Sequence, residues 1–472
     1  MWHWKSRLII ILTVVALSGC RHPLEIVGEG DIRSSSGTRD CTLEQQPCAN
    51  LVSGDYKVTY TAVPREGWRF VRWERCGQQY PKCSFNVPAS LVSLFTGQTV
   101  APLQAVFEPG TAQYNVLLII SDDQAFDDYG FAGHPHLQTP SLDALAAQSV
   151  QFPQTYVSST CRPTFANLLT GMPEHKHGVT YIDGPMLGSY TTVADRMMNA
   201  GYATYQIGKF WEGDPGLRGF SDHVPFDTLV GNLAIGRTSV QPFFELVNQG
   251  NSPWFAWFSP FMPHAPHTTP DQYTSLYSGL GLNNAEIQYY GMVSWFDAVV
   301  GQVLAGVPAD TIVVYLADNG YVQSSLGGVS QSRSKGTQYE NGIRTQLLIR
   351  HPNKPATIQY DLASDVDVTA TILAMAQGVH SDLPGRDLFT AAPTPQQVFG
   401  SRSTLGISNP NSTLLWRWIR SDNWKLVDSA EGTDELYDLA SDPGEAQNLI
   451  NAPQWTSLLS DLRNGLETLW LQ

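Results

Sequence analysis

The chain is poor in charge, in basic residues and in cysteine for its length. Only 15% of its 472 residues are charged, and 43 Asp and Glu outnumber 28 Lys and Arg, which gives a formal net charge of −15. The shortage of basic residues argues against nucleic acid as the main partner, because phosphate binding needs a basic surface. A small anionic substrate is not excluded, since a few local cations or a metal can reverse the field inside a pocket. With 42% apolar residues the chain can bury a large core, and its length predicts two or three domains.

No apolar run in the sequence is long enough to span a bilayer comfortably. The apolar run at the N-terminus, Leu8 to Gly19, follows a basic start and ends in Leu17-Ser18-Gly19-Cys20, which resembles a bacterial lipobox. This pattern predicts a lipoprotein signal peptide over residues 1–19, cleavage before Cys20 and lipidation of the Cys20 thiol. An ordinary signal peptide that happens to contain a cysteine is the alternative. We therefore expect an exported protein that contacts the bacterial cell envelope through an acyl anchor, and Arg21 after the cysteine favours the outer membrane.

The five other cysteines form two close pairs and one single residue. Cys41 with Cys48, and Cys76 with Cys83, lie in an exported segment where disulfides persist, so we expect each pair to form a disulfide. Metal binding is the alternative for these four, but no histidines neighbour them. Cys161 is left alone, and a lone cysteine in an exported protein is a candidate reactive residue.

Residues 20–112 are expected to form a small all-β module. Tyr56 to Ala62 alternates as a strand does, and a last strand is expected near Ala105 to Phe107. The stretch from Ala62 to Trp73 resembles the "A-x-P-x-x-G-x-x-F-x-x-W" core of small all-β repeats on bacterial surface proteins. No catalytic grouping is visible there. We interpret the module as a spacer or adhesion element, stapled by disulfides because it is too small for a strong core.

Residues 113–397 alternate continuous apolar runs with helical patterns. The runs are Asn115 to Ile120, Trp254 to Phe258, Thr311 to Leu316 and Gln346 to Ile349. Such runs suit strands buried on both faces of a mostly parallel sheet. Helices are expected to begin at Thr139-Pro140 and to run from Thr191 to Asn199, so the pattern predicts an α/β sandwich.

Residues 398–472 are expected to form a C-terminal subdomain. Leu414 to Arg420 and Trp424 to Asp428 read as strands. The last helix carries an apolar stripe of Trp455, Leu458, Leu459, Leu462, Leu466 and Leu469. These elements predict a small sheet with one helix packed on it.

Acidic residues follow two of the predicted strands. Asp122 and Asp123 end the first apolar run, and Asp318 with Asn319 follows the run that starts at Thr311. In open α/β sheets, ligands gather at the carboxyl ends of the strands. Three carboxylates and an amide are hard oxygen ligands, suited to Ca²⁺ or Mg²⁺. The alternative is that each acid caps a helix or a turn.

Cys161 is expected at the N-terminus of a helix. Pro163 sits where a helix can begin, and Gly171 sits where it can end. A helix N-terminus lowers a thiol pKa and attracts anions. A buried structural cysteine is the alternative.

The stretch from Cys161 to Gly171 resembles the sulfatase signature "C-x-P-x-R" continued by "A-x-L-L-T-G". Further stretches similar to sulfatase motifs occur in the family's order between Asn115 and Leu449. They are the Asp122-Asp123 pair, Gly208-Lys209, Pro263 to His267, Asp318 to Gly320, Lys335 to Arg344, and a closing motif of Glu435 to Leu439, Asp442 to Glu445 and Asn448. The resemblance to this family, which belongs to the alkaline phosphatase superfamily, implies a sulfatase-like sandwich with a small C-terminal sheet-plus-helix subdomain.

The resemblance also implies roles for individual residues. Cys161 matches the cysteine that is oxidised to formylglycine and then acts as the nucleophile. Lys209, His264 and Lys335 match the groups that bind sulfate and protonate the leaving alcohol. The metal ligands would be Asp122, Asp123, Asp318 and Asn319, with Ca²⁺ expected and Mg²⁺ the alternative. His175 would support the cysteine helix, and plain packing or surface placement is the alternative for His175 and His267.

Two positions depart from the family pattern. Phe165 stands where the signature has arginine, and Trp211 stands where the family has histidine. The arginine holds the nucleophile and helps the modifying enzyme, and phenylalanine can do neither. The expected function is hydrolysis of sulfate esters, of the arylsulfatase kind, on a small-molecule or polysaccharide substrate. The alternatives are a sulfatase-like binding protein without turnover and a phosphate or phosphonate ester hydrolase.

Overall fold

A computed structural model of the chain describes residues 20–52, 54–65, 68–76, 82–92, 100–109, 114–182, 186–224, 237, 239–249, 253–325, 329–330, 332–377, 382–404 and 413–471. The expected signal peptide therefore lies outside the described residues. Two compact units make up the chain: Met1–Val63 with Val71–Phe107, and Pro64–Phe70 with Glu108–Gln472. Among the described helices, none is both long and apolar enough to cross a membrane.

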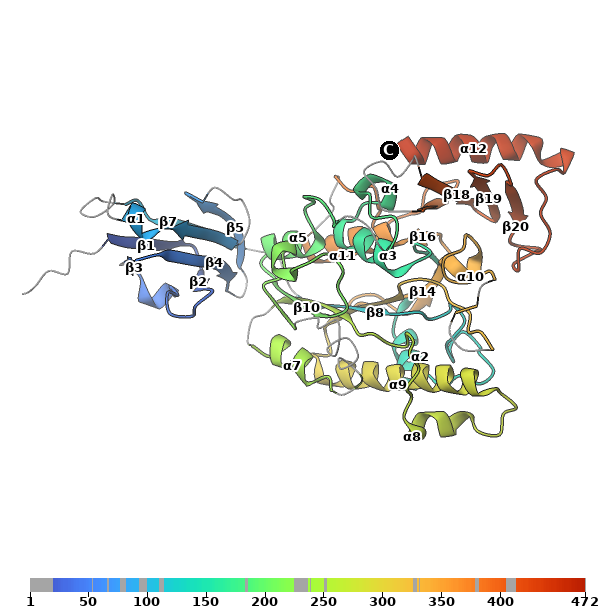
Figure 1. The fold of residues 1–472 in the computed structure, drawn as a ribbon, viewed down its shortest axis with the longest axis horizontal. Coiled ribbons are helices and arrows are strands. Elements are labelled where there is room, and N and C mark those ends of the chain that lie inside the picture. The colour runs from blue at the N-terminus through green and yellow to red at the C-terminus, as the bar shows by residue number, and fades with distance from the viewer. Residues whose placement is uncertain are drawn as a thin grey trace, which may run out of the picture. The chain divides into compact units, whose positions relative to one another are not determined.

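The first unit contains two small sheets, as the all-β prediction requires (Figure 1). One has the strand order β3-β1-β7-β5 and the other β2-β4-β6. Their bounds are β1 Cys20–Val27, β2 Gly30–Ser34, β3 Cys48–Val52, β4 Tyr56–Pro64, β5 Trp68–Glu74, β6 Lys82–Val87 and β7 Leu103–Pro109, with a short helix α1 at Ala89–Val92. Along the first part of β4, every second side chain is buried, which confirms the predicted alternation. Both expected disulfides, Cys41–Cys48 and Cys76–Cys83, are present.

A sheet of nine described strands forms the centre of the second unit, in the order β11-β10-β12-β8-β13-β14-β9-β15, with β16 also on β9. The bounds are β8 Val116–Ser121, β9 Val150–Tyr156, β10 Ala203–Gly208, β11 Asp222–Val224, β12 Trp254–Ser259, β13 Ile312–Ala317, β14 Arg344–Arg350, β15 Thr357–Ile358 and β16 Ala363–Ser364. Five neighbouring strands are parallel to one another: β11, β10, β12, β8 and β13. Strand β14 runs antiparallel to β13 and to β9. The sheet is thus mixed but mostly parallel, as predicted.

Helices cover both faces of this sheet, which makes the predicted α/β sandwich (Figure 1). On β8, Val116, Leu118 and Ile120 belong to one core, and Leu117 and Ile119 belong to the other. The first core includes helices α3 Cys161–Thr170, α5 Val193–Asn199 and α11 Asp365–Gln377; the second includes α2 Pro140–Ala146, α7 Gln241–Val247 and α9 Asn284–Gly306. Because strand side chains alternate, a continuous apolar run fills both layers. The shorter helices are α4 Glu174–His177, α8 Asp271–Thr274 and α10 Glu340–Ile343.

A four-stranded antiparallel sheet and a long helix lie near the C-terminus, within the second unit. The strands are β17 Gln397–Ser403, β18 Leu414–Ser421, β19 Trp424–Ser429 and β20 Glu435–Asp438, and the helix is α12 Thr456–Leu471. The helix packs Leu459, Leu462 and Leu466 on the sheet residues Ile419 and Leu426. The predicted apolar stripe therefore faces the sheet.

Candidate active site

Four polar residues meet at the carboxyl ends of two central strands. β8 and β13 are adjacent and parallel, so Asp122 and Asp123 lie beside Asp318 and Asn319, and all four are buried. The amide N–H of Asp123 donates to Asp318 Oδ1 at 3.1 Å. Asn319 Nδ2 donates to Asp123 Oδ1 at 2.9 Å. The structure thus brings together the whole set of acids and amide that the sequence singled out as metal ligands.

The backbone around this cluster is tightly constrained. Asp123 has φ 66°, in the left-handed region that a non-glycine residue rarely adopts. Gly320 lets another segment approach, because a Cβ there would lie 2.2 Å from the carbonyl oxygen of Asn341. Strained backbone of this kind is typical of functional sites.

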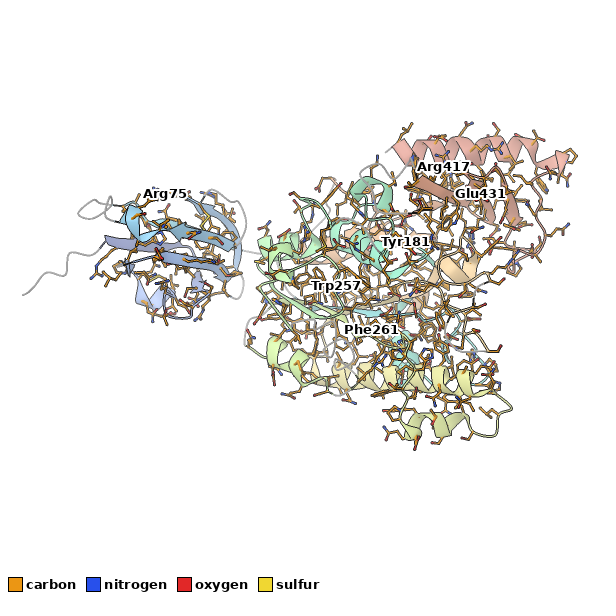
Figure 2. All side chains as sticks on the ribbon, in the orientation of Figure 1. Arg75, Tyr181, Trp257, Phe261, Arg417 and Glu431 are labelled. Atoms are coloured by element: carbon orange, nitrogen blue, oxygen red, sulfur yellow. A yellow bond between two sulfur atoms is a disulfide. The ribbon has the colours of Figure 1, made fainter. Side chains whose placement is uncertain are left out.

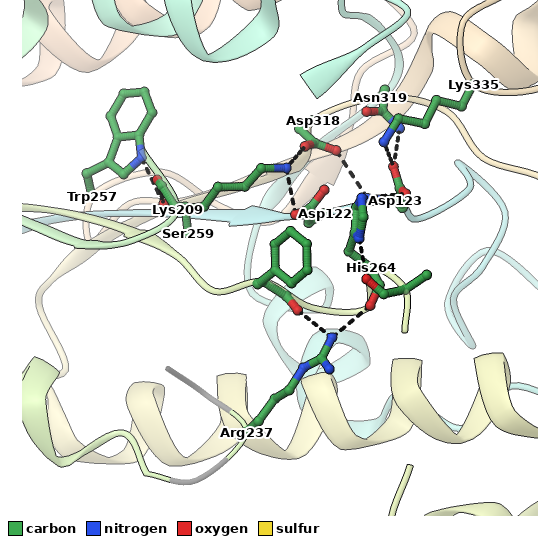
Figure 3. A network of polar contacts seen from close by, with 12 residues as sticks. Asp122, Asp123, Lys209, Arg237, Trp257, Ser259, His264, Asp318, Asn319 and Lys335 are labelled. Atoms are coloured by element: carbon green, nitrogen blue, oxygen red, sulfur yellow. Dashed lines mark hydrogen bonds and ion pairs between the residues drawn. The ribbon is translucent and has the colours of Figure 1, made fainter. Parts of the chain in front are cut away.

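Two lysines and a histidine surround the carboxylates (Figure 3). Lys209 Nζ lies 2.7 Å from Asp122 Oδ2 and 3.6 Å from Asp318 Oδ2. Lys335 Nζ forms an ion pair with Asp123 Oδ1. His264 Nε2 lies 3.4 Å from the other Asp123 oxygen. Each of the three basic side chains in the site therefore lies next to an aspartate carboxylate.

The cluster leaves polar oxygens that fit a bound cation. Within the described part of the chain, Asp122 Oδ1, Asp318 Oδ2 and Asn319 Oδ1 are buried without a hydrogen-bond partner. Burial, followed by repulsion from Asp122, raises the pKa of Asp318 well above its usual range. A divalent cation would coordinate the oxygens that lack a hydrogen bond and would relieve that repulsion. One ligand atom each from Asp122, Asp123 and His264 also lies within 4.8 Å of the others, so the residues present fit a divalent metal.

Cys161 is the first residue of helix α3, and the helix ends at Gly171 with φ 67°, as predicted. Of the two alternatives for its surroundings, Cys161 is buried, and burial raises its pKa and outweighs the lowering by Lys209 and Lys335. The two lysines act on the thiol, which places Cys161 in the same electrostatic site. The amide N–H of Gly336, the residue after Lys335, donates to the carbonyl oxygen of Ser159 at 2.7 Å.

Aromatic rings surround Lys209 where the family pattern has cations. Its Nζ lies 5.5 Å from the centre of the Phe165 ring and 5.4 Å from the rings of Trp211 and Phe261. Arg162 does not replace the missing arginine. Its Nε donates to Glu212 Oε1 at 2.8 Å, and both side chains are buried. The guanidinium of Arg162 is thus held in a structural ion pair.

The histidine that supports the cysteine helix is His177, and the expectation for His175 is wrong. His177 Nδ1 accepts from the amide N–H of Val179 at 3.1 Å, so its Nε2 carries the proton and donates to Asn167 Oδ1 at 2.7 Å. Burial lowers the pKa of His177 to about 3, which keeps the ring neutral. His175 instead stacks on Trp470 of α12, with ring centres 4.2 Å apart.

Arg237 is a residue at the site that no sequence pattern indicated. Its guanidinium donates to the carbonyl oxygens of Phe261 and His264 at 2.9 and 2.7 Å (Figure 3), and to that of Pro266 at 3.1 Å. These carbonyls belong to the segment after β12 that carries His264. One side chain thus fixes three backbone points next to the carboxylates, which a motif search on neighbouring residues cannot detect.

Comparisons with known proteins agree with this geometry. The family model described as Sulfatase matches residues 114–379, and one described as N-sulphoglucosamine sulphohydrolase, C-terminal, matches residues 333–472. The mouse protein Arylsulfatase J is 26% identical over 439 residues, which covers 77% of this chain and 71% of that protein. Human N-sulphoglucosamine sulphohydrolase is 26% identical over 455 residues and covers 75% of this chain and 89% of that protein.

Solved structures share the fold. Ps i-CgsB in complex with k-i-k-neocarrahexaose aligns with a TM-score of 0.63 at 22% identity, over 76% of this chain and 93% of that one. The phosphonate monoester hydrolase of Agrobacterium radiobacter also aligns with a TM-score of 0.63, at 19% identity, over 76% of this chain and 95% of that one. At these identities the likeness establishes the arrangement of helices and strands alone.

Proposed function

The chain belongs to the sulfatase family, and from this membership and the site we propose that it hydrolyses sulfate esters at the cell envelope. The observation that carries the proposal is the cluster of buried acids, buried Lys209 and partly buried Lys335 beside Cys161. Lys209 and Lys335 supply positive charge in a chain whose net charge is −15. A local field of this kind is what an anionic ester needs in an acidic protein.

We propose that the metal is Ca²⁺, with Mg²⁺ as the alternative. Asp122, Asp123, Asp318 and Asn319 would hold it through oxygen atoms, which suits a hard cation. When bound, the cation polarises the oxygens of the ester group. Lys209 already lies between Asp122 and Asp318 and adds charge on the side of Cys161.

The nucleophile in this proposal is Cys161 after its oxidation to formylglycine. One hydroxyl of the hydrated aldehyde attacks sulfur, and the S–O bond to the alcohol breaks. The second hydroxyl then loses its proton, the C–O bond to sulfate breaks, and the aldehyde re-forms. A buried thiol cannot complete this cycle, and the raised pKa of Cys161 also keeps it un-ionised.

His264 is the best-placed proton donor for the leaving alcohol. Its Nδ1 lies 2.6 Å from the carbonyl oxygen of Ala265, which can only accept, so Nδ1 carries a proton. Nε2 is therefore the atom that exchanges a proton at the carboxylate cluster, 3.4 Å from Asp123. Arg237 holds the carbonyl of His264 and so fixes the direction of the ring.

The deciding experiment is the mass of the Cys161 peptide together with hydrolysis of an aryl sulfate. Conversion lowers the peptide mass, and Cys161→Ala should abolish turnover while metal binding remains. Arylsulfatases and N-sulphoglucosamine sulphohydrolase among the relatives make aryl sulfates and sulfated glucosamines the first substrates to assay. An unmodified Cys161 without hydrolysis of any sulfate ester would contradict the proposal.

A phosphonate or phosphate ester hydrolase is the second candidate. The observation that favours it is the shared fold with a phosphonate monoester hydrolase. Turnover of a phenyl phosphonate that exceeds turnover of the matched phenyl sulfate would select it.

We also propose that acylated Cys20 anchors the mature chain, at the outer membrane. Labelled fatty acid should enter the wild-type protein and not Cys20→Ala. Equal labelling of both proteins would exclude the anchor.

A further inference from the structure

An apolar cavity lies between the two sheets of the first unit. Its volume is about 350 Å³, and it is lined by Arg21, His22, Val52, Tyr56, Arg75, Phe85, Val87, Val100, Ala101 and Leu103. Seven of these residues come from β1, β3 and β7 of one sheet and from β4 and β6 of the other, whereas Arg75 follows β5 and Val100 and Ala101 precede β7. Pockets that hold small ligands begin at roughly 300 Å³. The sandwich therefore leaves ligand-sized space in the place where side chains of the two sheets usually interdigitate.

The walls of this cavity offer few hydrogen bonds to a ligand. His22 Nδ1 and the Tyr56 hydroxyl lie 3.1 Å apart, and the Tyr56 hydroxyl also bonds to that of Tyr60 at 2.5 Å. Burial lowers the pKa of His22 to about 4, so the ring is neutral near pH 7. The ring of Phe85 packs against His22 with centres 4.7 Å apart. A saccharide, which needs a partner for each buried hydroxyl, would be poorly served by these walls.

Two arginines provide the charge at the cavity. Arg21 and Arg75 line it and are both exposed, and Figure 2 labels Arg75. Arg75 Nη1 donates to the carbonyl oxygen of Pro102 at 2.8 Å, and the guanidinium forms no ion pair with a carboxylate in the described ranges. Arg21 makes no ion pair with any residue that the structure describes. Arg75 also has φ 69°, a strained conformation of the kind found at ligand clamps.

We propose that this cavity binds a single hydrocarbon chain that carries an anionic head group. The hydrocarbon chain of the ligand fills the space between Val52, Phe85 and Leu103, and its anionic head group faces Arg21 and Arg75. An apolar interior beside two cations complements this chemistry, and the acidic character of the chain as a whole does not extend to this rim. A free fatty carboxylate and an anionic membrane lipid are two sources of the same chemistry. The proposal is independent of ester hydrolysis, since no cavity residue belongs to the active site.

The test uses the full chain carrying Cys20→Ser, so that no acyl chain of its own competes. A fluorescent probe, 11-(dansylamino)undecanoic acid, is titrated into the protein and then displaced with dodecanoate or with dodecanol. We expect saturable binding of one probe per chain. Arg21→Ala with Arg75→Ala should weaken dodecanoate by roughly three- to tenfold, the effect of exposed charge pairs, and leave dodecanol unchanged.

Two variants fill the cavity. Val87→Trp and, from the exposed rim, Ala101→Phe should each reduce probe affinity more than tenfold while both disulfides and aryl sulfate turnover are retained. Ala101→Phe keeps the test valid if Val87→Trp does not fold. Failure of the wild-type chain to bind the probe, or undiminished binding by a folded cavity-filling variant, would overturn the proposal.

Single-chain phospholipids distinguish the source of the ligand. Monomeric lysophosphatidylglycerol should displace the probe, and lysophosphatidylcholine should not, if the protein takes its ligand from an anionic membrane. Displacement by dodecanoate alone would identify a free fatty carboxylate and still support the cavity. Arginine-dependent binding to anionic vesicles without any probe binding would identify a surface contact and refute the cavity site.

Discussion

One half of the candidate active site keeps the residues of the family pattern, whereas the other half departs from the pattern at two positions. The metal half, made by the ends of β8 and β13, keeps the four residues that we propose as ligands, and three of their buried oxygens have no hydrogen-bond partner among the described residues. The nucleophile half, made by α3 and the residues after β10, keeps Cys161 and Lys209 but has Phe165 and Trp211 in place of cations. The two halves are built on different elements, so one can change while the other is retained.

The change in the nucleophile half is a local extension of the hydrophobic core. Phe165 is buried, belongs to the core on one face of the sheet and packs against Trp257 with ring centres 5.7 Å apart. Trp211 packs against the same core. An arginine at position 165 would need a partner in this apolar surrounding, because an unpaired buried charge is costly. The aromatic pair therefore stabilises the fold at the two positions where the family pattern has an arginine and a histidine.

The largest effect is expected from Asp318→Ala, which attacks the metal half. The variant should lose the bound cation, and aryl sulfate turnover should fall by a factor of about 10³ or more, because both metal charge and orientation are lost. With metal present, its thermal stability should drop, since a ligand bound only by the folded state stabilises that state. Metal content by elemental analysis and thermal unfolding would measure this.

Chelator sharpens the same test. Without metal, the stability difference between wild type and Asp318→Ala should close, because burial and repulsion from Asp122 make the Asp318 carboxylate unfavourable in the metal-free fold. The exposed Asp310→Ala serves as the matched control and should change neither property. An unchanged metal content in Asp318→Ala would contradict the assignment of this half.

The next effect is expected from Lys335→Ala. Lys335 pairs with Asp123 and acts electrostatically on Cys161, so it connects the two halves. Its removal should lower kcat by a factor of about 10²–10³, the cost of one preorganised charge at a reacting group. Lys335→Arg should recover part of the loss, and Lys354→Ala, outside the site, should behave as wild type. A change confined to KM would indicate uniform binding and contradict a role in the transition state.

A smaller and opposite effect is expected from restoring the nucleophile half. Phe165→Arg should raise the fraction of converted Cys161 and the turnover rate, by roughly tenfold if one charge-assisted contact is regained. Trp211→His should add to it, and the two changes need not be additive because they act on one site. Peptide mass and rate would be measured together. A converted cysteine in wild type, with no gain in Phe165→Arg, would show that the aromatic residue is tolerated.

These restored variants carry a stability cost that checks the structural interpretation. Phe165 is buried against Trp257, so its replacement should lower the free energy of unfolding by about 3–5 kcal/mol. Trp211 is only partly buried, and Trp211→His should cost less. Equal costs at both positions would argue against the core extension.

The sequence predicted the parts of this molecule that depend on local pattern. Buried strands were found because continuous apolar runs fill both faces of the sheet, and the clustering of the proposed ligands could be predicted because they stand directly after β8 and β13. The pKa of Cys161 could not be predicted, because the position in α3 lowers it and burial by distant residues raises it more. For the same reason, Arg237 was missed, and the role of His177 was assigned to His175. Their roles depend on backbone carbonyls and on Asn167, which only the tertiary structure brings within reach.

The smallest expected effect concerns how the nucleophile half is held. Glu174 accepts hydrogen bonds from the Ser401 amide and hydroxyl of β17 and from the Ser158 hydroxyl, at 2.9, 2.7 and 2.9 Å. Asn167 Nδ2 donates to Ser158 Oγ at 3.2 Å. Ser158 precedes the cysteine helix α3, and Asn167 lies within it. This chain of contacts connects the C-terminal sheet to the segment that carries Cys161.

Burial raises the pKa of Glu174 to about 7, so the folded state binds its proton more tightly than the unfolded chain does. The resulting stabilisation is fully present below the ordinary pKa near 4.5 and is lost as the pH rises through about 7.

Glu174→Gln keeps the shape without titrating. The free energy of unfolding of Glu174→Gln minus that of wild type should therefore increase by about 1–3 kcal/mol between pH 5 and pH 8.5, because only the wild type loses stability. Burial raises the pKa of Asp365 to about 8 and the charge of Glu174 contributes to that rise, so Glu174→Gln also removes this repulsion at alkaline pH, which acts in the same direction. Denaturant unfolding at the two pH values measures the shift, with the exposed Glu245→Gln as control. Parallel pH profiles for Glu174→Gln and wild type would mean that Glu174 is already ionised at low pH, and the link from β17 to the cysteine helix would then be an ordinary carboxylate network.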